Sequence, residues 1–210
     1  MSEEGSMKIF TSCFAIIVAM LFASAAEAQQ TINGCLIKRR TSCPGANLSG
    51  MDLTKSNLSN ADLSGANLSG ANLSFDKIAE TNLTKANLSG ANLTGTILSG
   101  TYMNNANLAR ANLDKADLSQ ATLPDANLRE TSLAGANFSM ANLKGADLTG
   151  ANAKGAVFIM ASLTNANLTR ADLTEATLVG ADLRNAILTG ARFCKTTMPD
   201  RSVNNSGCPK

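Results

Sequence analysis

Residues that could support catalysis are scarce in this chain of 210 residues. It contains no histidine, so it has neither an imidazole base nor a histidine metal ligand. Its many serines occupy one position of a short repeat, and no base is placed to activate them. No GxxxxGK(S/T) motif accompanies the glycines. We therefore expect no enzymatic activity, no cofactor and no small-molecule substrate.

Cysteine is the residue type with the clearest chemistry. Cys13 lies in the N-terminal segment, Cys35 and Cys43 precede the repeats, and Cys194 and Cys208 lie near the C-terminus. Spacings of eight and fourteen residues lack the close cysteine pair of zinc sites, so we expect no metal. The four cysteines that remain without Cys13 allow three disulfide pairings, and free thiols are the alternative.

Residues 1–28 resemble a targeting segment. The run Ile9–Ala26 is apolar, and an Ala-Glu-Ala motif that ends at residue 28 fits a signal-peptidase site. We expect a cleaved signal peptide because the run is short for a membrane span; an uncleaved anchor is the alternative. Export predicts a periplasmic or secreted protein, in a compartment where disulfides persist.

The charge pattern argues against a nucleic-acid partner. The formal net charge is +2, and it is +4 once residues 1–28 are removed. Basic and acidic residues alternate along the rest of the chain, and no stripe of lysine and arginine is interleaved with aromatic residues.

A repeat of five residues organises the chain. From Leu48 to Met198 an apolar centre recurs every fifth residue in 31 units, with a small residue two positions earlier. A straight strand would place successive centres on opposite faces, because its side chains alternate with period two. In an α-helix the centres would rotate by roughly 140° per unit and spread around the axis. The chain must therefore turn once per unit, and stacked turns bury a continuous core.

These units resemble the pentapeptide-repeat family. The A-(N/D)-L-x-x pattern runs in unbroken phase over residues 46–198. The resemblance implies an all-β fold, a right-handed quadrilateral β-helix with four units per coil and nearly eight coils. At ~4.8 Å per layer the rod would be roughly 35–40 Å long. Residues 29–45 would then form an N-terminal cap closed by a disulfide, and residues 199–210 a disulfide-closed C-terminal tail.

In such a rod the two ends are tens of ångströms apart. A disulfide requires Cα atoms within about 7 Å. The pairings that remain are Cys35–Cys43 and Cys194–Cys208. We expect each disulfide to staple a loop over a terminal coil, where unpaired strand edges would otherwise be exposed.

Two units depart from the pattern. Asp76 occupies a small inward position, where Ser56 and Thr96 would be its stacking neighbours. We expect a buried carboxylate satisfied by these hydroxyls, and a functional acid is the alternative. Ala153 replaces a large centre, so we expect a small cavity or a local inward shift unless Phe138 and Phe158 fill the space.

Outward positions are mostly polar, with one apolar cluster. The exceptions on a single predicted face are Met140, Val157, Ile159, Met160 and Val179, with Ile97 farther along the same face. Contiguous exposed apolar residues often mark an interface. We interpret the cluster as a contact surface for a protein partner or for a second copy in a homodimer; residues that merely suit a sheet surface are the alternative.

Two functional hypotheses follow. The first is an exported, rigid and non-catalytic module with a structural or protein-interaction role. The second comes from the family resemblance, since some relatives are cytoplasmic DNA mimics that bind type II topoisomerases and protect them from quinolones. Those relatives rely on a strongly acidic surface, whereas this chain is slightly basic and begins with an export-like segment. The sequence favours the first hypothesis.

Overall fold

The structure of the protein is a computed structural model that describes residues 30–209. The predicted signal peptide, residues 1–28, lies outside the described residues. In the part that is described, the chain forms no helix with the length and apolarity needed to cross a membrane.

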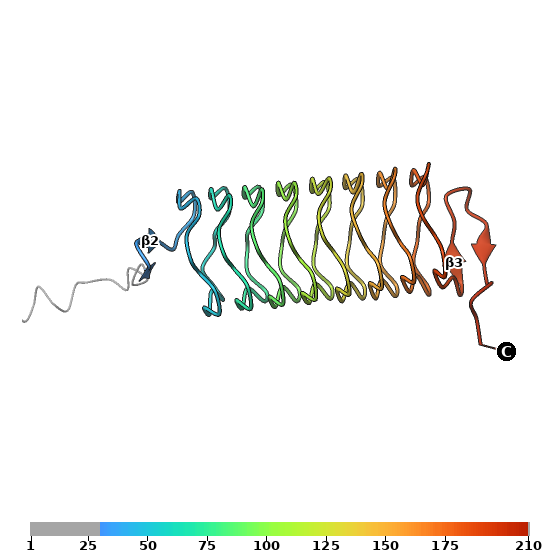
Figure 1. The fold of residues 1–210 in the computed structure, drawn as a ribbon, viewed down its shortest axis with the longest axis horizontal. Coiled ribbons are helices and arrows are strands. Elements are labelled where there is room, and N and C mark those ends of the chain that lie inside the picture. The colour runs from blue at the N-terminus through green and yellow to red at the C-terminus, as the bar shows by residue number, and fades with distance from the viewer. Residues whose placement is uncertain (1–29, 210) are drawn as a thin grey trace, which may run out of the picture. The chain divides into compact units, whose positions relative to one another are not determined.

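Successive coils of the solenoid repeat every twenty residues. Asn67 forms parallel bridges with Asn47 on one side and Asn87 on the other, and the same spacing recurs along the chain. The N–H of Leu48 donates to the carbonyl of Asn67 at 2.7 Å, and the N–H of Asn67 donates to the carbonyl of Ala46 at 2.9 Å. Figure 1 shows the coils stacked one after another from blue to red. Each layer is thus hydrogen-bonded to the layers above and below it.

The corners explain two preferences of the repeat. The residue two positions after each centre from Cys43 to Phe193 has positive φ, as at Gly65 (65°) and Lys85 (58°), a region in which glycine has no steric cost. In most units with an outward Asn or Asp before the centre, this side chain accepts a hydrogen bond from the backbone at the corner. At Asp52, for example, the Oδ1 atom accepts from the N–H of Thr54 at 3.1 Å. These side chains stabilise the turn locally, as Asx turns do.

Four walls enclose the core, and we number them by their centres, which follow in steps of twenty residues. Wall 1 runs from Leu48 to Leu188, wall 2 from Leu53 to Phe193, wall 3 from Leu58 to Met198, and wall 4 from Cys43 to Leu183. Centres in the middle of the rod, such as Leu88, Leu108 and Leu128, are fully buried, and the small alanines beside them are also buried. The four-sided β-helix expected from the repeat is therefore confirmed.

The solenoid begins one unit earlier than predicted. Ser42 forms a parallel bridge with Asp62, and the N–H of Cys43 donates to the carbonyl of Asp62 at 2.8 Å. Cys43 therefore occupies a centre, where nearly all other units have leucine. Because cysteine is not the usual residue at a centre, this unit was not recognised in the sequence. The predicted boundary at residue 46 therefore lies five residues after the observed start at residue 41.

The N-terminal cap is a short hairpin followed by a tight turn. Strands β1 (Thr31–Ile32) and β2 (Cys35–Leu36) pair antiparallel, with Ile32 opposite Cys35. Ile32, Cys35 and Ile37 are buried and belong to the same apolar cluster as the leucine centres. The cap therefore closes the N-terminal end of the core with apolar side chains.

The C-terminal end is built differently. Strand β3 (Thr196–Thr197) completes the last unit, where Thr197 forms a parallel bridge with Thr177. The chain then reverses, and β4 (Val203–Asn204) returns antiparallel to β3. Figure 1 shows this hairpin beyond the last coil. The tail thus adds one antiparallel strand to the end of wall 3.

Candidate interaction surface

Both terminal segments are tied down by disulfides. Cys35 is bonded to Cys43 with Cα atoms 5.6 Å apart, and Cys194 is bonded to Cys208 with Cα atoms 4.6 Å apart. At the C-terminal end the N–H of Gly207 also donates to the carbonyl of Phe193 at 2.6 Å. The two pairings are those expected from the sequence, and each closes a short loop at one end of the rod.

Asp76 is a structural carboxylate rather than a reactive one. It is only 3% exposed. Its Oδ1 atom accepts from the N–H groups of Asn57 (3.0 Å) and Lys77 (2.7 Å). Its Oδ2 atom accepts from both the N–H and the hydroxyl of Ser56. Four donors thus compensate the burial of the carboxylate, as buried polar groups require.

The expected contact between Asp76 and Thr96 is absent. The Thr96 hydroxyl donates instead to the carbonyl of Leu73 at 2.7 Å. Backbone N–H groups of Asn57 and Lys77 supply the donors that we had assigned to that hydroxyl. The Thr96 hydroxyl thus bonds to a carbonyl of wall 2 one layer below, and not to the carboxylate in its own column.

The predicted apolar cluster is contiguous across three coils of wall 3. The N–H of Met140 donates to the carbonyl of Ile159 at 2.8 Å, and the N–H of Met160 donates to the carbonyl of Val179 at 2.9 Å. These bonds place the four residues on adjacent layers, next to Val157. We call this set, Met140, Val157, Ile159, Met160 and Val179, the wall 3 patch.

The two methionines dominate the wall 3 patch. Met160 is 65% exposed and Met140 is 60% exposed, whereas Val157 and Val179 are half-buried. The Met160 side chain lies along the next layer, where its Cγ atom is 3.4 Å from the position of a Cβ atom on Gly180. Flexible, polarizable methionines on a flat sheet suit a surface that adapts to a partner.

Phe75 is an exposed apolar residue outside the wall 3 patch that was not predicted from the sequence. It is 78% exposed at the corner between walls 2 and 3. Its ring covers Gly95 of the next coil so closely that a Cβ atom there would lie 2.6 Å from the ring. The signal was available, because the corner position after a centre is otherwise glycine, polar, charged or methionine.

Wall 1 carries a ladder of asparagines whose polar atoms satisfy one another. The Nδ2 atom of Asn127 donates to Asn107 at 2.9 Å, and the Nδ2 atom of Asn107 donates to Asn87 at 3.1 Å. The carbonyl oxygens of these side chains also accept from corner N–H groups. The ladder thus stabilises the stack and leaves few groups for a ligand.

Some charged side chains on the surface form ion pairs, and most of these pairs join neighbouring layers. Arg110 contacts Glu130 at 2.8 Å, and Arg129 contacts Asp147 at 2.9 Å. The Arg184 guanidinium holds the pKa of Asp182 well below its ordinary value. Acidic and basic side chains thus lie next to one another at these positions of the described surface.

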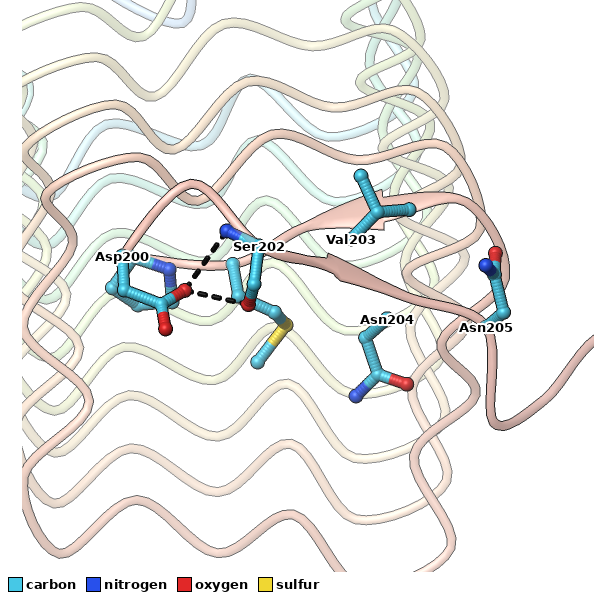
Figure 2. A pocket seen from close by; sticks show the side chains of 7 residues that line it. Asp200, Ser202, Val203, Asn204 and Asn205 are labelled. Carbon is cyan, nitrogen blue, oxygen red and sulfur yellow. Dashed lines mark hydrogen bonds between the residues drawn. The ribbon is translucent and has the colours of Figure 1, made fainter.

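A shallow hollow of about 510 Å³ lies at the C-terminal end. It is lined by residues of the terminal hairpin between Met198 and Asn205. Figure 2 shows the Asp200 carboxylate accepting from the N–H and hydroxyl of Ser202, while Val203 and Asn204 point to opposite sides of the hairpin. Residues 30–209 contain no group of three or more acidic or cysteine side chains that could hold a metal ion.

The geometry defines the class of protein: a four-sided, right-handed β-helical solenoid built from five-residue units. The family model of pentapeptide repeats matches eight copies, over residues 40–74, 86–123, 111–150, 125–158 and 161–198. The chain therefore belongs to the pentapeptide repeat family.

Solved structures with this fold include a trypsin-treated variant of QnrB1, a plasmid-mediated fluoroquinolone resistance protein. It is 17% identical, with a TM-score of 0.54, and the match covers 71% of this chain and 88% of that one. HetL, involved in heterocyst differentiation regulation in the cyanobacterium Nostoc, is 30% identical over 79% of this chain and 90% of its own, with a TM-score of 0.29. A pentapeptide repeat protein of the Arabidopsis thaliana thylakoid lumen is 34% identical, with a TM-score of 0.30, and the match covers 51% of this chain and 71% of that one. A search of curated proteins finds no match.

Proposed function

We propose that this protein is an exported, non-catalytic interaction module that binds a protein partner through the wall 3 patch. The observation that carries the proposal is the continuity of five apolar side chains over three hydrogen-bonded layers. Soluble proteins rarely leave a contiguous apolar patch of this kind uncovered, and such patches often mark an interaction site. The rod provides a rigid support, because each layer is bonded to the next on every wall.

Export is supported by the chemistry of the two ends. Each terminal segment is held by a disulfide, and disulfides persist in oxidising compartments. The apolar run and the Ala-Glu-Ala motif of residues 1–28 provide the matching signal. N-terminal sequencing of the protein from its source cell tests this part: a chain that begins at Gln29 supports it, and an intact N-terminus in the cytosol contradicts it.

The patch is tested by charging it. The double change Val157→Lys with Met160→Glu in the full chain places charges in the middle of the patch, where both side chains point away from the core. We expect unchanged circular dichroism and the loss of a crosslinked partner in the source cell. The partner is another protein if sedimentation of the purified chain shows a monomer, and a second copy if it shows a dimer that the change dissociates.

A matched control changes the same two repeat positions on wall 4. Ser162→Lys with Asn165→Glu introduces the same charges in the next unit of the chain, outside the patch. The control should keep the crosslinked species. If the wall 3 variant and the control behave alike, the apolar side chains are ordinary surface residues and the proposal fails.

Topoisomerase binding is the alternative that the family resemblance suggests. QnrB1 is described as a fluoroquinolone resistance protein, but at 17% identity the likeness concerns the fold alone. A DNA mimic needs a strongly acidic surface, whereas this chain has a formal net charge of +2 and several of its acidic groups, such as Glu130 and Asp147, are paired with arginine. Protection of purified gyrase from a quinolone by the full chain would favour this alternative.

A further inference from the structure

The C-terminal end of the solenoid is only half covered. The tail closes wall 3 with β4 and reaches wall 2 through Gly207, whose N–H donates to Phe193 at 2.6 Å. No described residue lies across the ends of walls 4 and 1. Leu183 and Leu188, the last centres of these walls, are therefore partly exposed, whereas Leu163 and Leu168 one coil below are fully buried.

Backbone groups are also left unpaired along this open edge. In every lower coil of walls 4 and 1 the N–H of the centre and the N–H of its corner residue donate to the next layer, and the carbonyl of the small residue accepts from it. Among the described residues these groups have no partner on the last coil of walls 4 and 1. They are the N–H groups of Leu183, Asn185, Leu188 and Gly190 and the carbonyls of Ala181 and Ala186.

Apolar side chains lie next to the unpaired backbone groups. Ile187, between the small position and the centre of wall 1, is 50% exposed, although the same column holds asparagine or aspartate in all earlier coils. Ala186 is partly exposed as well. The hollow lined by the terminal hairpin adjoins the end of the rod and includes Met198, the last centre of wall 3.

We infer that this open edge binds an extended segment of a partner protein, which adds two further units to walls 4 and 1. The segment would run parallel to the last coil, because that direction pairs the same donors and acceptors as all lower layers do. The edge determines the sequence that the bound segment needs. The segment has a small residue followed two positions later by a leucine-like residue, and this pair recurs after five residues, so that the large side chains cover Leu183 and Leu188.

The protein's own tail supports an added strand at this end. β4 already pairs with β3 on wall 3, with Val203 opposite Thr197. The end of the last coil is thus able to hold one more strand, and strand addition is a common mode of peptide recognition. An edge with unpaired groups and apolar margins is otherwise a site of aggregation. This inference is independent of the wall 3 patch.

The probe is a fluorescent decapeptide with the sequence of residues 161–170, Ala-Ser-Leu-Thr-Asn-Ala-Asn-Leu-Thr-Arg. When the peptide pairs in parallel with the last coil, the N–H groups of its second and seventh residues donate to the carbonyls of Ala181 and Ala186. The N–H groups of its third and eighth residues point away from the edge. We expect saturable binding to the full chain in fluorescence anisotropy. N-methylation of the second and seventh amides should weaken binding about tenfold or more, and N-methylation of the third and eighth should change it less than about threefold.

Changes in the protein test the same contact from the other side. Leu183→Lys with Leu188→Lys places charges on the edge and should weaken peptide binding about tenfold or more. The wall 3 variant Val157→Lys with Met160→Glu should bind the peptide as the parent does. If the lysine variant loses structure, the two N-methylated peptides still decide the question without any change to the protein.

Three results overturn the inference. The peptide shows no saturable binding, or both N-methylated peptides bind equally well. The third is a dimer of the full chain in sedimentation equilibrium that the two lysine changes dissociate, because a second copy would then occupy the edge.

Discussion

The rings of Phe138 and Phe158 stack with their centroids 5.1 Å apart and their planes 8° from parallel. Both are fully buried centres of wall 3 on neighbouring coils. Ala153 belongs to the same coil as Phe158 and stands where a leucine is expected, yet it is only 1% exposed. The coil therefore contains one centre larger and one centre smaller than leucine, so the extra volume of the phenylalanine offsets part of the volume that the missing leucine would fill.

The change Ala153→Leu tests this compensation. A leucine added beside the two rings should overpack the coil and cost about 1–3 kcal/mol in the free energy of unfolding. Adding Phe158→Leu to this variant should recover much of the loss, because the larger side chain is then removed. Urea denaturation of the two single variants and the double variant measures the coupling, and strictly additive costs would contradict the compensation.

The inward and outward positions of the repeat should differ in their contribution to stability. Leu108→Ala removes a fully buried centre of wall 1 and should cost roughly 2–5 kcal/mol. Asn107→Ala removes side-chain hydrogen bonds to Asn87 and Asn127 on a partly exposed ladder, which should cost about 1 kcal/mol. Equal costs in urea denaturation would mean that the assignment of inward positions is wrong.

The disulfides should stabilise the ends of the rod more than its middle. Each closes a short loop, of eight residues at Cys35–Cys43 and fourteen at Cys194–Cys208, so each should contribute about 2–3 kcal/mol in the chain-entropy model. Reduction should therefore raise hydrogen exchange at the first and last coils before the middle. Exchange that rises uniformly along the chain on reduction would argue against this role.

The period of five was sufficient to predict a chain that turns once per unit, because no straight helix or strand buries every fifth side chain on one side. The four-sided coil came from the resemblance to the pentapeptide-repeat family. With four units per coil, the number of a residue gives its place in the coil, and this located the centres, the small positions and the wall 3 patch. Cys43 shows the limit of the pattern: it fills a centre without resembling one, so the first unit was assigned to the cap.

The remaining features depend on contacts that a repeat does not encode. The Ser56 hydroxyl donates to Asp76 as predicted, but the other donors are backbone N–H groups, and those of Asn57 and Lys77 lie outside the regular ladder, which the identity of neighbouring side chains does not reveal. The tail after Met198 carries no repeat, so its path over walls 2 and 3, and the open edge at Leu183 and Leu188, emerge only from the structure. Phe75 could have been identified from the sequence, because no other corner position holds an aromatic residue.

Asp76→Ala should destabilise the second coil although alanine is the usual residue at this position. The change leaves the N–H groups of Asn57 and Lys77 without their acceptor, and Asn57 has a φ of 47° that the carboxylate helps to hold. We expect a cost of about 1–3 kcal/mol, with Asp76→Asn less affected because its oxygen still accepts. A variant of unchanged stability, with a regular bridge between Asn57 and Lys77 in its structure, would contradict this prediction.

The pKa of Asp182 should depend on Arg184. The guanidinium donates to both carboxylate oxygens at 2.6–3.0 Å and lowers this pKa, with further donors in the N–H of Arg184 and the hydroxyl of Thr164. Because the folded pKa lies below the ordinary value of about 3.9, the contribution to stability is present above pH ~4 and is lost as the pH falls through the folded pKa.

In Arg184→Gln the pKa of Asp182 should rise towards its ordinary value but stay below it. Carboxyl ¹³C titration by NMR measures the shift, and Arg110→Gln is the control that should raise the pKa of Glu130 and leave that of Asp182 unchanged. An Asp182 pKa that is the same in the parent and in Arg184→Gln would show that the ion pair does not form in solution.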